Sequence, residues 1–582
     1  MATNAPDHLR HFGKSIAVLL AASGAVLLWF AFGPFGIYSP IGTSDPWFYT
    51  GYFTNFSYLL LHHGFSYYVS RLPWIIPGRF AYSIASPEFA TLLLCAAIAT
   101  ASGWSLYWVV RWYYGNSPAI VAALAVITNT YFMSAAGWQY PDGAAIAYAM
   151  VGLAFYLRPH GNPGWNGFLA AAALTLSGFT HMAIAPAILG LLVIPILRWR
   201  HSPKELLRQG LCTLAGVGLT TLLLMAVSKS MLGDARVFKP QFDMWISIVQ
   251  HPNYLPDMWG TGPGFLVTAV RLFTPLFLLV FGPVLLKAVR KPSPIAWPCY
   301  FGLLTCSLLF AFQEFLMHRV SLRVPFVSSY MLILVFCFAG VVLGELWNYK
   351  KASPAVRNVA ATALAILTSA LPFVYGVLRP GGRPAATGEP VWTMLACLGI
   401  AAIILAILGF RRGFPFQCGA AALVLIAISA GPGMDPNIGA GLGQQKIIHA
   451  SNLWSGPDAA TFQCLMKFED YLKSQVDDPK WDLIFWWDQD EPLAALFNSA
   501  ESLYVSGHID VGEKLSQGSG RLYLLNTMMV HLTSHPERIA ERTKLMASRG
   551  IGVGYQRHMD FMYAGTNFTV TVQDLTIQTA LR

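Results

Sequence analysis

The sequence predicts a polytopic α-helical membrane protein with a C-terminal soluble α/β domain. Of its 582 residues, 55% are hydrophobic and only 11% are charged, whereas roughly a quarter of the residues in soluble domains are charged. A single aqueous core stops growing near ~250–300 residues, so lipid must cover much of this apolar surface. The apolar residues also come in long runs that are separated by short basic clusters.

Each long apolar run is a candidate membrane span. A spanning helix needs about 20 apolar residues, because the hydrocarbon core is about 30 Å thick. Such runs predict spans at roughly 15–36, 87–110, 118–136, 142–157, 209–228, 264–286, 295–313, 324–346, 358–378, 390–410 and 416–431. The stretch 167–197 is too long for one span and short for two. If it forms two helices, the total is about 13 spans.

The basic clusters favour two helices in that stretch and set the orientation. With two, the N-terminus is cytoplasmic, and so is every later cluster: Arg198/Arg200/Lys204/Arg208, Lys287/Arg290/Lys291, Lys350/Lys351/Arg357 and Arg411/Arg412. This arrangement follows the tendency of Lys and Arg to stay in the cytoplasm, and it places the C-terminus outside. The net charge of +10 is spread over these clusters rather than along one stripe, so no nucleic-acid partner is indicated.

Two domains follow from this pattern. Residues 1–431 are expected to form the transmembrane domain, with long outer loops at 37–86 and 229–263. After a Gly- and Pro-containing linker, residues 432–582 are expected to form a soluble non-cytoplasmic α/β domain. Within it, apolar runs predict strands at Trp481–Trp487 and Leu522–Leu525, and periodicity predicts helices at 458–475, 491–503 and 526–548.

The first outer loop carries an acid followed by a run of aromatic residues. Asp45 and Pro46 precede aromatic and leucine residues at positions 48, 52, 56, 59 and 60, which share one helical face. The pattern predicts an amphipathic helix at the membrane surface that begins just after Asp45. Asp45 is therefore either an N-cap or a carboxylate held at the outer face near a lipid-linked substrate.

Asp45, its Asp-x-x-x-Tyr spacing to Tyr49, and the long outer loop after the first span resemble the GT-C glycosyltransferases. That superfamily includes protein O-mannosyltransferases and bacterial aminoarabinose and related sugar transferases. The similarity covers about the first 260 residues as a layout of spans and outer loops. Family members often carry a second acid directly after the first, but this chain has Pro46 there.

The resemblance implies sugar transfer with inversion. A polyprenyl-phosphate-linked sugar donor would pass its sugar to a glycan, lipid or protein hydroxyl outside the cytoplasm, in the bacterial inner membrane. Asp45 would be the general base. Asp142 occupies the place of a family acid at the outer start of the fourth span, with a helix N-cap as its equal alternative.

A phosphate leaving group requires positive charge. Outer-side candidates for substrate binding are Arg236, Lys239, Arg271, His318 and Arg319. Arg271 lies within a span, where a charge is costly and marks a functional site unless it snorkels to the interface.

Aromatic and further polar candidates lie near the two acids. Tyr49, Trp138 and Tyr140 are candidate sugar-binding aromatics, with an interfacial belt as the alternative for the last two. Arg71 is a candidate for binding lipid headgroups. We interpret His181 as a hydrogen-bonded helix-end residue, with a ligand or base as the alternative. The spacing of His, Cys and Asp shows no metal site and no cofactor is assigned, although a divalent cation stays open.

Two other function classes compete with this interpretation. A transporter or flippase would require intramembrane acids and a pseudo-repeat, whereas the acids here gather at the outer face. A non-catalytic, polysaccharide-handling subunit would keep glycan binding without transfer. Because neither G-x-x-x-x-G-K-[ST] nor G-x-G-x-x-G occurs in the sequence, an ATP-driven pump is not supported.

Overall fold

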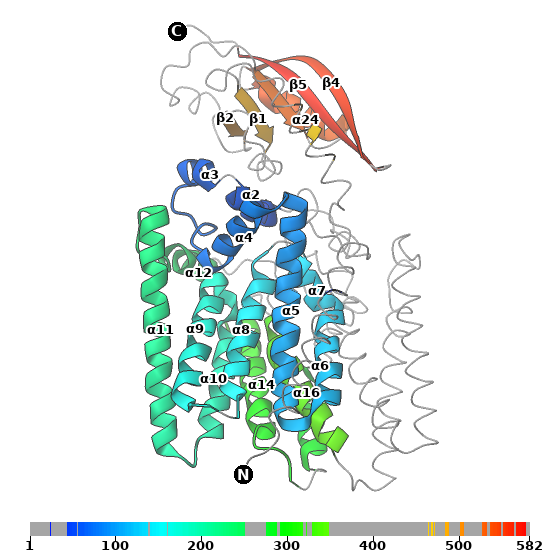
Figure 1. The fold of residues 1–582 in the computed structure, drawn as a ribbon. Helices are drawn as coiled ribbons and strands as arrows, with labels where there is room; N and C mark the ends of the chain where they lie inside the picture. The colour runs from blue at the N-terminus through cyan, green and yellow to red at the C-terminus, as the bar shows by residue number, and fades with distance from the viewer. Residues whose placement is uncertain are drawn as a thin grey trace, which may run out of the picture. The chain divides into compact units, whose positions relative to one another are not determined.

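The structure is a computed structural model (Figure 1). It describes Gly24 and residues 44–54, 56–137, 140–159, 161–250, 275–276, 278–287, 291–317, 322 and 329–348. In the C-terminal region it describes residues 464, 467–468, 471, 483–487, 501–505, 527–531, 536–548, 551–563 and 566–577. The spans predicted at 15–36, 358–378, 390–410 and 416–431 lie outside these residues, apart from Gly24.

The chain divides into two compact units. One unit comprises Met1–Phe35, Phe65–Trp74 and Leu92–Trp454, and the other comprises Gly36–Gly64, Ile75–Thr91 and Ser455–Arg582. The first is a helical bundle, and the second contains short helices and a β-sheet.

The described helices of the bundle follow the predicted order of spans. They are α5 (Pro87–Tyr114, from Leu92 onward in this unit), α6 (Asn116–Thr128), α7 (Thr130–Gly137), α8 (Asp142–Leu157), α9 (Pro163–Thr180), α10 (Ala185–Arg198), α11 (Pro203–Leu232), α12 (Lys239–Gln250), α14 (Ala296–Ala311) and α16 (Leu332–Asn348). Among the described residues, three helical segments are long and apolar enough to cross a membrane: Phe89–Tyr114, Pro203–Leu232 and Ala296–Leu316.

The stretch 167–197 forms two helices, as its flanking charges predicted. Helix α9 ends at Thr180, a 3₁₀ turn (Met182–Ile184) follows, and α10 begins at Ala185. The prediction of one span over 118–136 is wrong. Asn129 ends α6 there, and its side chain accepts a hydrogen bond from the backbone N–H of Phe132 at 2.8 Å. This local bond starts a new helix, α7, in place of a continuous one.

From α8 to α11, successive helices run in opposite directions, and the helices that pack most closely are often not adjacent in sequence. Helix α9 lies between α8 and α11, while α14 lies between α10 and α16 (Figure 1). We call the end at which α8 begins the Asp142 end; α9 and α11 finish there, and α10 and α16 begin there. The opposite end, where α5, α8, α10 and α16 finish, is the Glu345 end.

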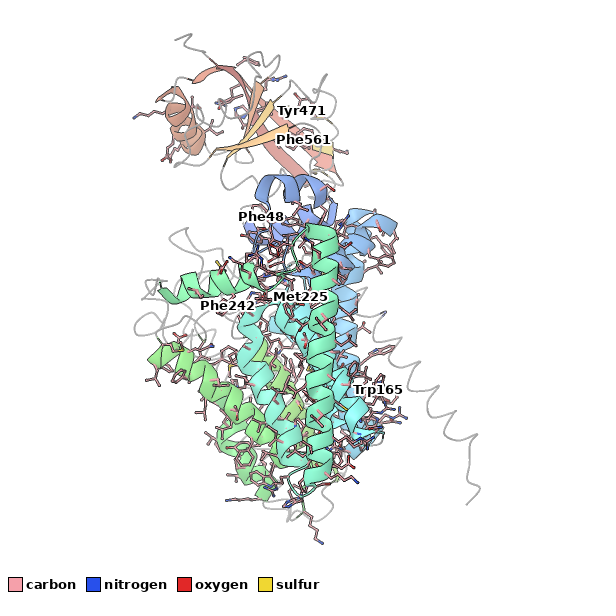
Figure 2. The ribbon with its side chains drawn as sticks, turned by 90° about the vertical axis from the view of Figure 1, so that its left-hand side faces the viewer. Phe48, Trp165, Met225, Phe242, Tyr471 and Phe561 are labelled. Carbon is pink, nitrogen blue, oxygen red and sulfur yellow. The ribbon has the colours of Figure 1, made fainter. Side chains whose placement is uncertain are left out.

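Helix α11 lies at one edge of the bundle (Figure 1). Only one stripe of it is buried, made of Gln209, Gly216, Thr220, Leu224 and Ser228. Its remaining surface exposes large leucines, including Leu214 and Leu222. In a spanning helix, such a surface faces lipid. Helix α12 then runs across the direction of α11 (Figure 2).

A buried carboxylate at the Glu345 end is hydrogen-bonded by its neighbours. Glu345 accepts bonds from the Tyr114 hydroxyl at 2.9 Å and from the Ser293 backbone N–H at 2.6 Å. These bonds tie α16 to the end of α5 and to the segment before α14. A buried charge held by such donors has a structural explanation.

The second unit contains α2 (Ser44–Thr54), α3 (Phe56–His63) and α4 (Leu72–Ile84) up to the start of α5, with α4 in this unit from Ile75 onward. Helix α2 begins at Ser44, so the prediction that the helix starts after Asp45 is wrong by two residues. The prediction of one apolar face is also wrong, because residues 49–53 are all buried. Phe53 packs its ring on Tyr82, with centroids 5.4 Å apart.

The C-terminal strands form a five-stranded sheet in the order β2-β1-β3-β5-β4. β1 (Leu483–Trp487) pairs in parallel with β2 (Glu501–Val505) and β3 (Thr527–His531). β5 (Thr566–Ile577) pairs antiparallel with β3 and with β4 (Ile551–Tyr563). Helix α24 (Pro536–Ser548) connects β3 to β4.

Two of the helix predictions in this region fail in part. The helix predicted over 526–548 is wrong at its start, where β3 stands, and the helix predicted over 491–503 overlaps β2. Both segments pair in the sheet with β1, which is distant in sequence, and such pairing overrides local helix periodicity. The strand predicted at Leu522–Leu525 lies outside the described residues.

The close approach of α10 to α14 generates a stability prediction. A Cβ on Gly190 would lie 2.6 Å from the Gly302 carbonyl oxygen and 2.7 Å from a Leu334 methyl carbon. We expect Gly190→Ala to lower the free energy of unfolding by ~1–3 kcal/mol, because the backbones must separate. Thermal unfolding in nanodiscs measures it.

Gly210→Ala is the matched control, since a Cβ there meets no atom within 4 Å. It should leave stability unchanged or raise it by up to ~1 kcal/mol through helix propensity. Equal effects of the two variants would contradict the close packing of α10 on α14.

Candidate functional site

A buried carboxylate marks the Asp142 end of the bundle. Asp142 is the first residue of α8 and its side chain is 0% exposed. The residue before it, Pro141, takes the N-cap position and makes no side-chain cap bond. Because a charge is costly to bury among apolar helices, hydrogen-bond donors must surround it.

Tyr330 supplies one of these donors. It lies in the 3₁₀ turn (Ser329–Met331) that leads into α16, and it is 0% exposed. Its hydroxyl donates to Oδ1 of Asp142 at 2.5 Å. This bond joins the start of α8 to the start of α16.

His181 lies beside the same carboxylate, in the turn between α9 and α10. Its Nδ1 accepts a hydrogen bond from the backbone N–H of Ala183 at 3.2 Å, so the side chain caps the 3₁₀ turn. Its Nε2 lies 4.0 Å from Oδ1 of Asp142. The imidazole also contacts the rings of Tyr140 and Tyr330, with centroids 5.7 and 5.5 Å away. The interpretation of His181 as a hydrogen-bonded helix-end residue is confirmed.

Arg71 places a buried positive charge in this cluster. Only 1% of it is exposed. Its guanidinium carbon lies 4.0 Å from the ring centroid of Tyr67 and 5.3 Å from that of Tyr140, which are cation–π distances. The two tyrosine hydroxyls are 3.5 Å apart. We call Tyr67, Arg71, Tyr140, Asp142, His181 and Tyr330 the Asp142 cluster.

The environment holds His181 in its neutral form. Burial, and then the nearby charge of Arg71, lower the pKa of the imidazole well below its usual range. The geometry agrees, because Nδ1 accepts a hydrogen bond and so carries no proton, which leaves the proton on Nε2.

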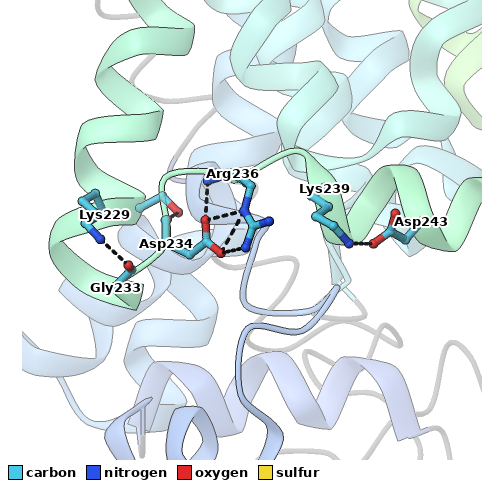
Figure 3. A network of polar contacts seen from close by, with 7 residues as sticks. Lys229, Gly233, Asp234, Arg236, Lys239 and Asp243 are labelled. Atoms are coloured by element: carbon cyan, nitrogen blue, oxygen red, sulfur yellow. Dashed lines mark hydrogen bonds and ion pairs between the residues drawn. The ribbon is translucent and has the colours of Figure 1, made fainter.

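Arg236 and Lys239 lie beyond the end of α11 in exposed ion pairs (Figure 3). Arg236 donates to both carboxylate oxygens of Asp234, which lowers the pKa of that carboxyl to about 2. Lys239 pairs with Asp243 one helical turn on. Both cations face acids of their own segment, and their role in substrate binding stays a prediction.

Of the candidate site residues predicted from the sequence, the structure places Asp142 and Tyr140 in one cluster, where both lie beside His181. Tyr49 is fully buried in α2 of the second unit. Asp45 is in the same helix, but its side chain lies outside the described residues. The candidates Trp138, Arg271, His318 and Arg319 also lie outside them.

Sequence reasoning missed Tyr330 and Tyr67 and gave Arg71 a different role. Tyr330 stands near the start of the apolar span predicted over 324–346, where a tyrosine is typical of a membrane interface. Arg71 was expected to meet lipid headgroups, yet it is buried. In the sequence, the available signal for a buried Arg71 was its position between a tyrosine-rich stretch and an apolar stretch.

The described residues contain no group of three His, Cys, Asp or Glu side chains arranged to hold a metal ion. The Asp142 cluster combines one carboxylate, one guanidinium and one neutral imidazole. Such a set suits a substrate that carries both hydroxyl groups and a negative charge.

Comparison with known proteins shows the fold. No protein-family model and no curated protein matches the chain. The crystal structure of ArnT from Cupriavidus metallidurans bound to undecaprenyl phosphate is similar, with a TM-score of 0.55 and 14% sequence identity over 96% of this chain and 98% of that one. The apo state of the same protein gives a TM-score of 0.53 at 14% identity, over 97% and 98%.

An oligosaccharyltransferase from Archaeoglobus fulgidus in the apo form gives a TM-score of 0.44 at 11% identity, over 95% of this chain and 74% of that one. ArnT, an aminoarabinose transferase, is a GT-C glycosyltransferase. The likeness to ArnT shows that the chain has a GT-C fold, which confirms the predicted resemblance at the level of the fold.

The hydroxyl of Tyr330 generates a stability prediction. Tyr330→Phe keeps the ring contact with His181 and removes the bond to Asp142. Because a hydrogen bond to a charged group contributes about 1.5–3 kcal/mol, unfolding should become easier by that amount. Tyr113→Phe, which removes a bond to the neutral Leu157 carbonyl, should cost only ~0.5–1.5 kcal/mol. A smaller loss for Tyr330→Phe than for Tyr113→Phe would contradict the burial of a charged Asp142.

The lowered pKa of His181 generates a pH prediction. Below its ordinary value of about 6.5, the unfolded chain binds a proton at His181 that the folded chain does not. Stability should therefore fall as pH drops from about 6.5 toward the lower folded value. His181→Gln removes this titration, so wild type should lose stability relative to the variant between pH 7.5 and 5 in thermal unfolding. Parallel curves would show that His181 titrates normally.

Proposed function

We propose that the chain is a membrane glycosyltransferase that transfers a sugar from a polyprenyl-phosphate donor to a hydroxyl group of a cell-envelope glycan, lipid or protein. The observation that carries the proposal is the Asp142 cluster, in which a buried carboxylate and a buried guanidinium are held by neighbouring tyrosines. Support comes from the GT-C fold and from the undecaprenyl phosphate that ArnT binds.

The phosphate of the polyprenyl-phosphate sugar donor is negatively charged, so the site needs a positively charged side chain to bind it. Arg71 is buried, and its guanidinium lies over the rings of Tyr67 and Tyr140. A guanidinium forms bidentate hydrogen bonds to phosphate and is weakly hydrated, so it suits a desolvated phosphate site. In the proposal, Arg71 binds the donor phosphate and stabilises it as it leaves. The exposed Arg236 and Lys239 remain secondary candidates for this role.

The transfer itself needs a base and a stabilised transition state. The acceptor oxygen forms a bond to the anomeric carbon while the bond from that carbon to the phosphate oxygen breaks, with inversion. The acceptor proton passes to a carboxylate, and polyprenyl phosphate departs. We assign the base to Asp45. Asp142, whose Oδ1 accepts a hydrogen bond from the Tyr330 hydroxyl, presents its negative charge to the positive charge that develops on the sugar.

The proposed site lies at the Asp142 end of the bundle, and we place this end outside the cytoplasm. The basic residues Arg158, Arg198, Arg200 and Lys204 gather at the Glu345 end, where α8 and α10 finish and α11 begins. The positive-inside tendency favours the cytoplasm for that end. We further propose residence in a bacterial inner membrane, with a cytoplasmic N-terminus and a C-terminal domain that is periplasmic or extracellular. A divalent cation at the donor phosphate stays open.

The test is sugar transfer by purified protein in nanodiscs. A panel of radiolabelled polyprenyl-phosphate monosaccharides is supplied with a cell-envelope extract as acceptor. Asp142→Asn and Asp45→Asn should each lower the rate at least about 100-fold, because the amide keeps the shape but loses the charge or the proton acceptor. Donor binding should stay nearly unchanged in Asp45→Asn.

Asp560→Asn is the control variant, since Asp560 is exposed on β4 and pairs with Thr569. It should transfer at the wild-type rate. Full activity of both Asp45→Asn and Asp142→Asn would remove the two carboxylates from the mechanism. Movement of the labelled lipid across the bilayer without transfer would favour a flippase, and binding without either would favour a non-catalytic subunit.

A further inference from the structure

His181 carries a hydrogen-bond donor that the fold has buried and left unused. The Ala183 N–H donates to Nδ1, so the ring proton sits on Nε2. Within the described part of the chain, Nε2 has no hydrogen-bond partner and is shielded from solvent. Such a donor costs free energy in the folded state and is uncommon unless a ligand uses it.

This N–H group lies near the carboxylate of Asp142 but is too far away to form a hydrogen bond with it. Nε2 and Oδ1 are 4.0 Å apart, whereas an N–H···O bond spans about 2.7–3.2 Å. A single oxygen atom can lie within hydrogen-bond distance of both atoms. If that oxygen belongs to a hydroxyl group, it accepts from Nε2–H and donates to Oδ1, and the second lone pair of Oδ1 remains for Tyr330.

We propose that His181 Nε2 and Asp142 Oδ1 together bind one hydroxyl group of the donor sugar, and that His181 is the residue that determines which sugar is accepted. This inference rests on the proposed function, because it assumes a sugar-carrying lipid donor. It goes further by naming the subsite that recognises the sugar and the hydrogen-bond polarity that the sugar must present.

The donor sugar fits this subsite better than the acceptor. The guanidinium carbon of Arg71 lies 5.3 Å from the ring centroid of Tyr140, and the imidazole centroid of His181 lies 5.7 Å from it, so the proposed phosphate site and the imidazole are near neighbours. The sugar of a polyprenyl-phosphate donor is attached directly to that phosphate. The rings of Tyr140 and Tyr330 flank His181 and offer apolar surface to the C–H face of a sugar.

This subsite distinguishes between donor sugars because a sugar without the matching hydroxyl group leaves His181 and Asp142 without their hydrogen-bond partner. A donor that lacks the hydroxyl leaves Nε2–H without an acceptor and takes a proton donor away from Asp142. Loss of such a pair lowers affinity about 10- to 100-fold. A methyl group in the same place would also lose both bonds.

Two substitutions separate the role of the Nε2–H group as a hydrogen-bond donor from the role of His181 in capping the 3₁₀ turn. In His181→Asn, the side-chain oxygen can accept from Ala183 N–H as Nδ1 does, but no N–H reaches the position of Nε2. In His181→Gln, the longer amide can place an N–H near that position. His201→Asn is the matched control, because His201 is exposed at the Glu345 end beside Arg200.

The experiment measures binding by native mass spectrometry of the full chain in nanodiscs. The probes are undecaprenyl phosphate, a panel of undecaprenyl-phosphate monosaccharides, and mono-deoxy analogues of the one that binds best. His181→Asn should weaken binding of the best monosaccharide donor 10- to 100-fold and leave undecaprenyl phosphate unchanged. His181→Gln should recover part of the loss, and one deoxy analogue should bind wild type as weakly as the parent donor binds His181→Asn.

Other outcomes overturn the inference. Equal weakening of undecaprenyl phosphate and of the sugar donors would assign His181 a structural role. Wild type that binds no sugar donor better than undecaprenyl phosphate would show that no sugar is recognised. The proposed function is tested separately by the transfer assay. If sugar binding depends on His181 but no sugar is transferred, the proposed enzyme activity is rejected and the sugar subsite is supported. If sugar is transferred at the same rate with and without the His181 substitution, the enzyme activity is supported and the sugar subsite at His181 is rejected.

Discussion

The hydrogen bond from Tyr330 to Asp142 connects two segments that are 188 residues apart, inside a bundle of apolar helices. A carboxylate buried there would be very costly without donors, because lipid offers none. The start of α8 must therefore stay against the start of α16, and His181 and Tyr140 pack beside them. The arrangement of the helix ends around the site follows from satisfying this one charge.

The two ends of the bundle handle a buried carboxylate differently. Glu345 is hydrogen-bonded by the Tyr114 hydroxyl and by the Ser293 N–H, and this accounts for it as a connection between helices. At the Asp142 end, the neighbouring imidazole keeps an unpaired Nε2–H at 4.0 Å from the carboxylate. Among the described residues, buried polar atoms without a partner also occur at the Glu345 end, and Nη1 of Arg111 is one of them. What sets the Asp142 end apart is that the unpaired N–H lies close to a buried carboxylate, which is the arrangement that the proposed sugar subsite uses.

The GT-C fold is retained although only 14% of the residues match ArnT. Lipid-facing positions such as those of α11 need only be apolar, and helix contacts such as Gly190 on Gly302 need only be small. Most positions of the fold can therefore be occupied by several residue types, which allows the sequence identity to be low. Fold likeness does not carry the chemistry, which in the proposed function depends on the particular side chains of the Asp142 cluster.

The sequence by itself determined the helices α8, α9 and α10 and the break between α9 and α10, since hydropathy and basic clusters are local signals. It also pointed to Asp142 and Tyr140, which stand at a span boundary. The break at Asn129 and the strand β3 escaped it, because a side-chain cap and sheet pairing overrode the periodicity. Only the tertiary structure decided that Arg71, His181 and Tyr330 join Asp142. These residues come from separate helix ends, and burial and hydrogen-bond satisfaction among them depend on how the helices pack.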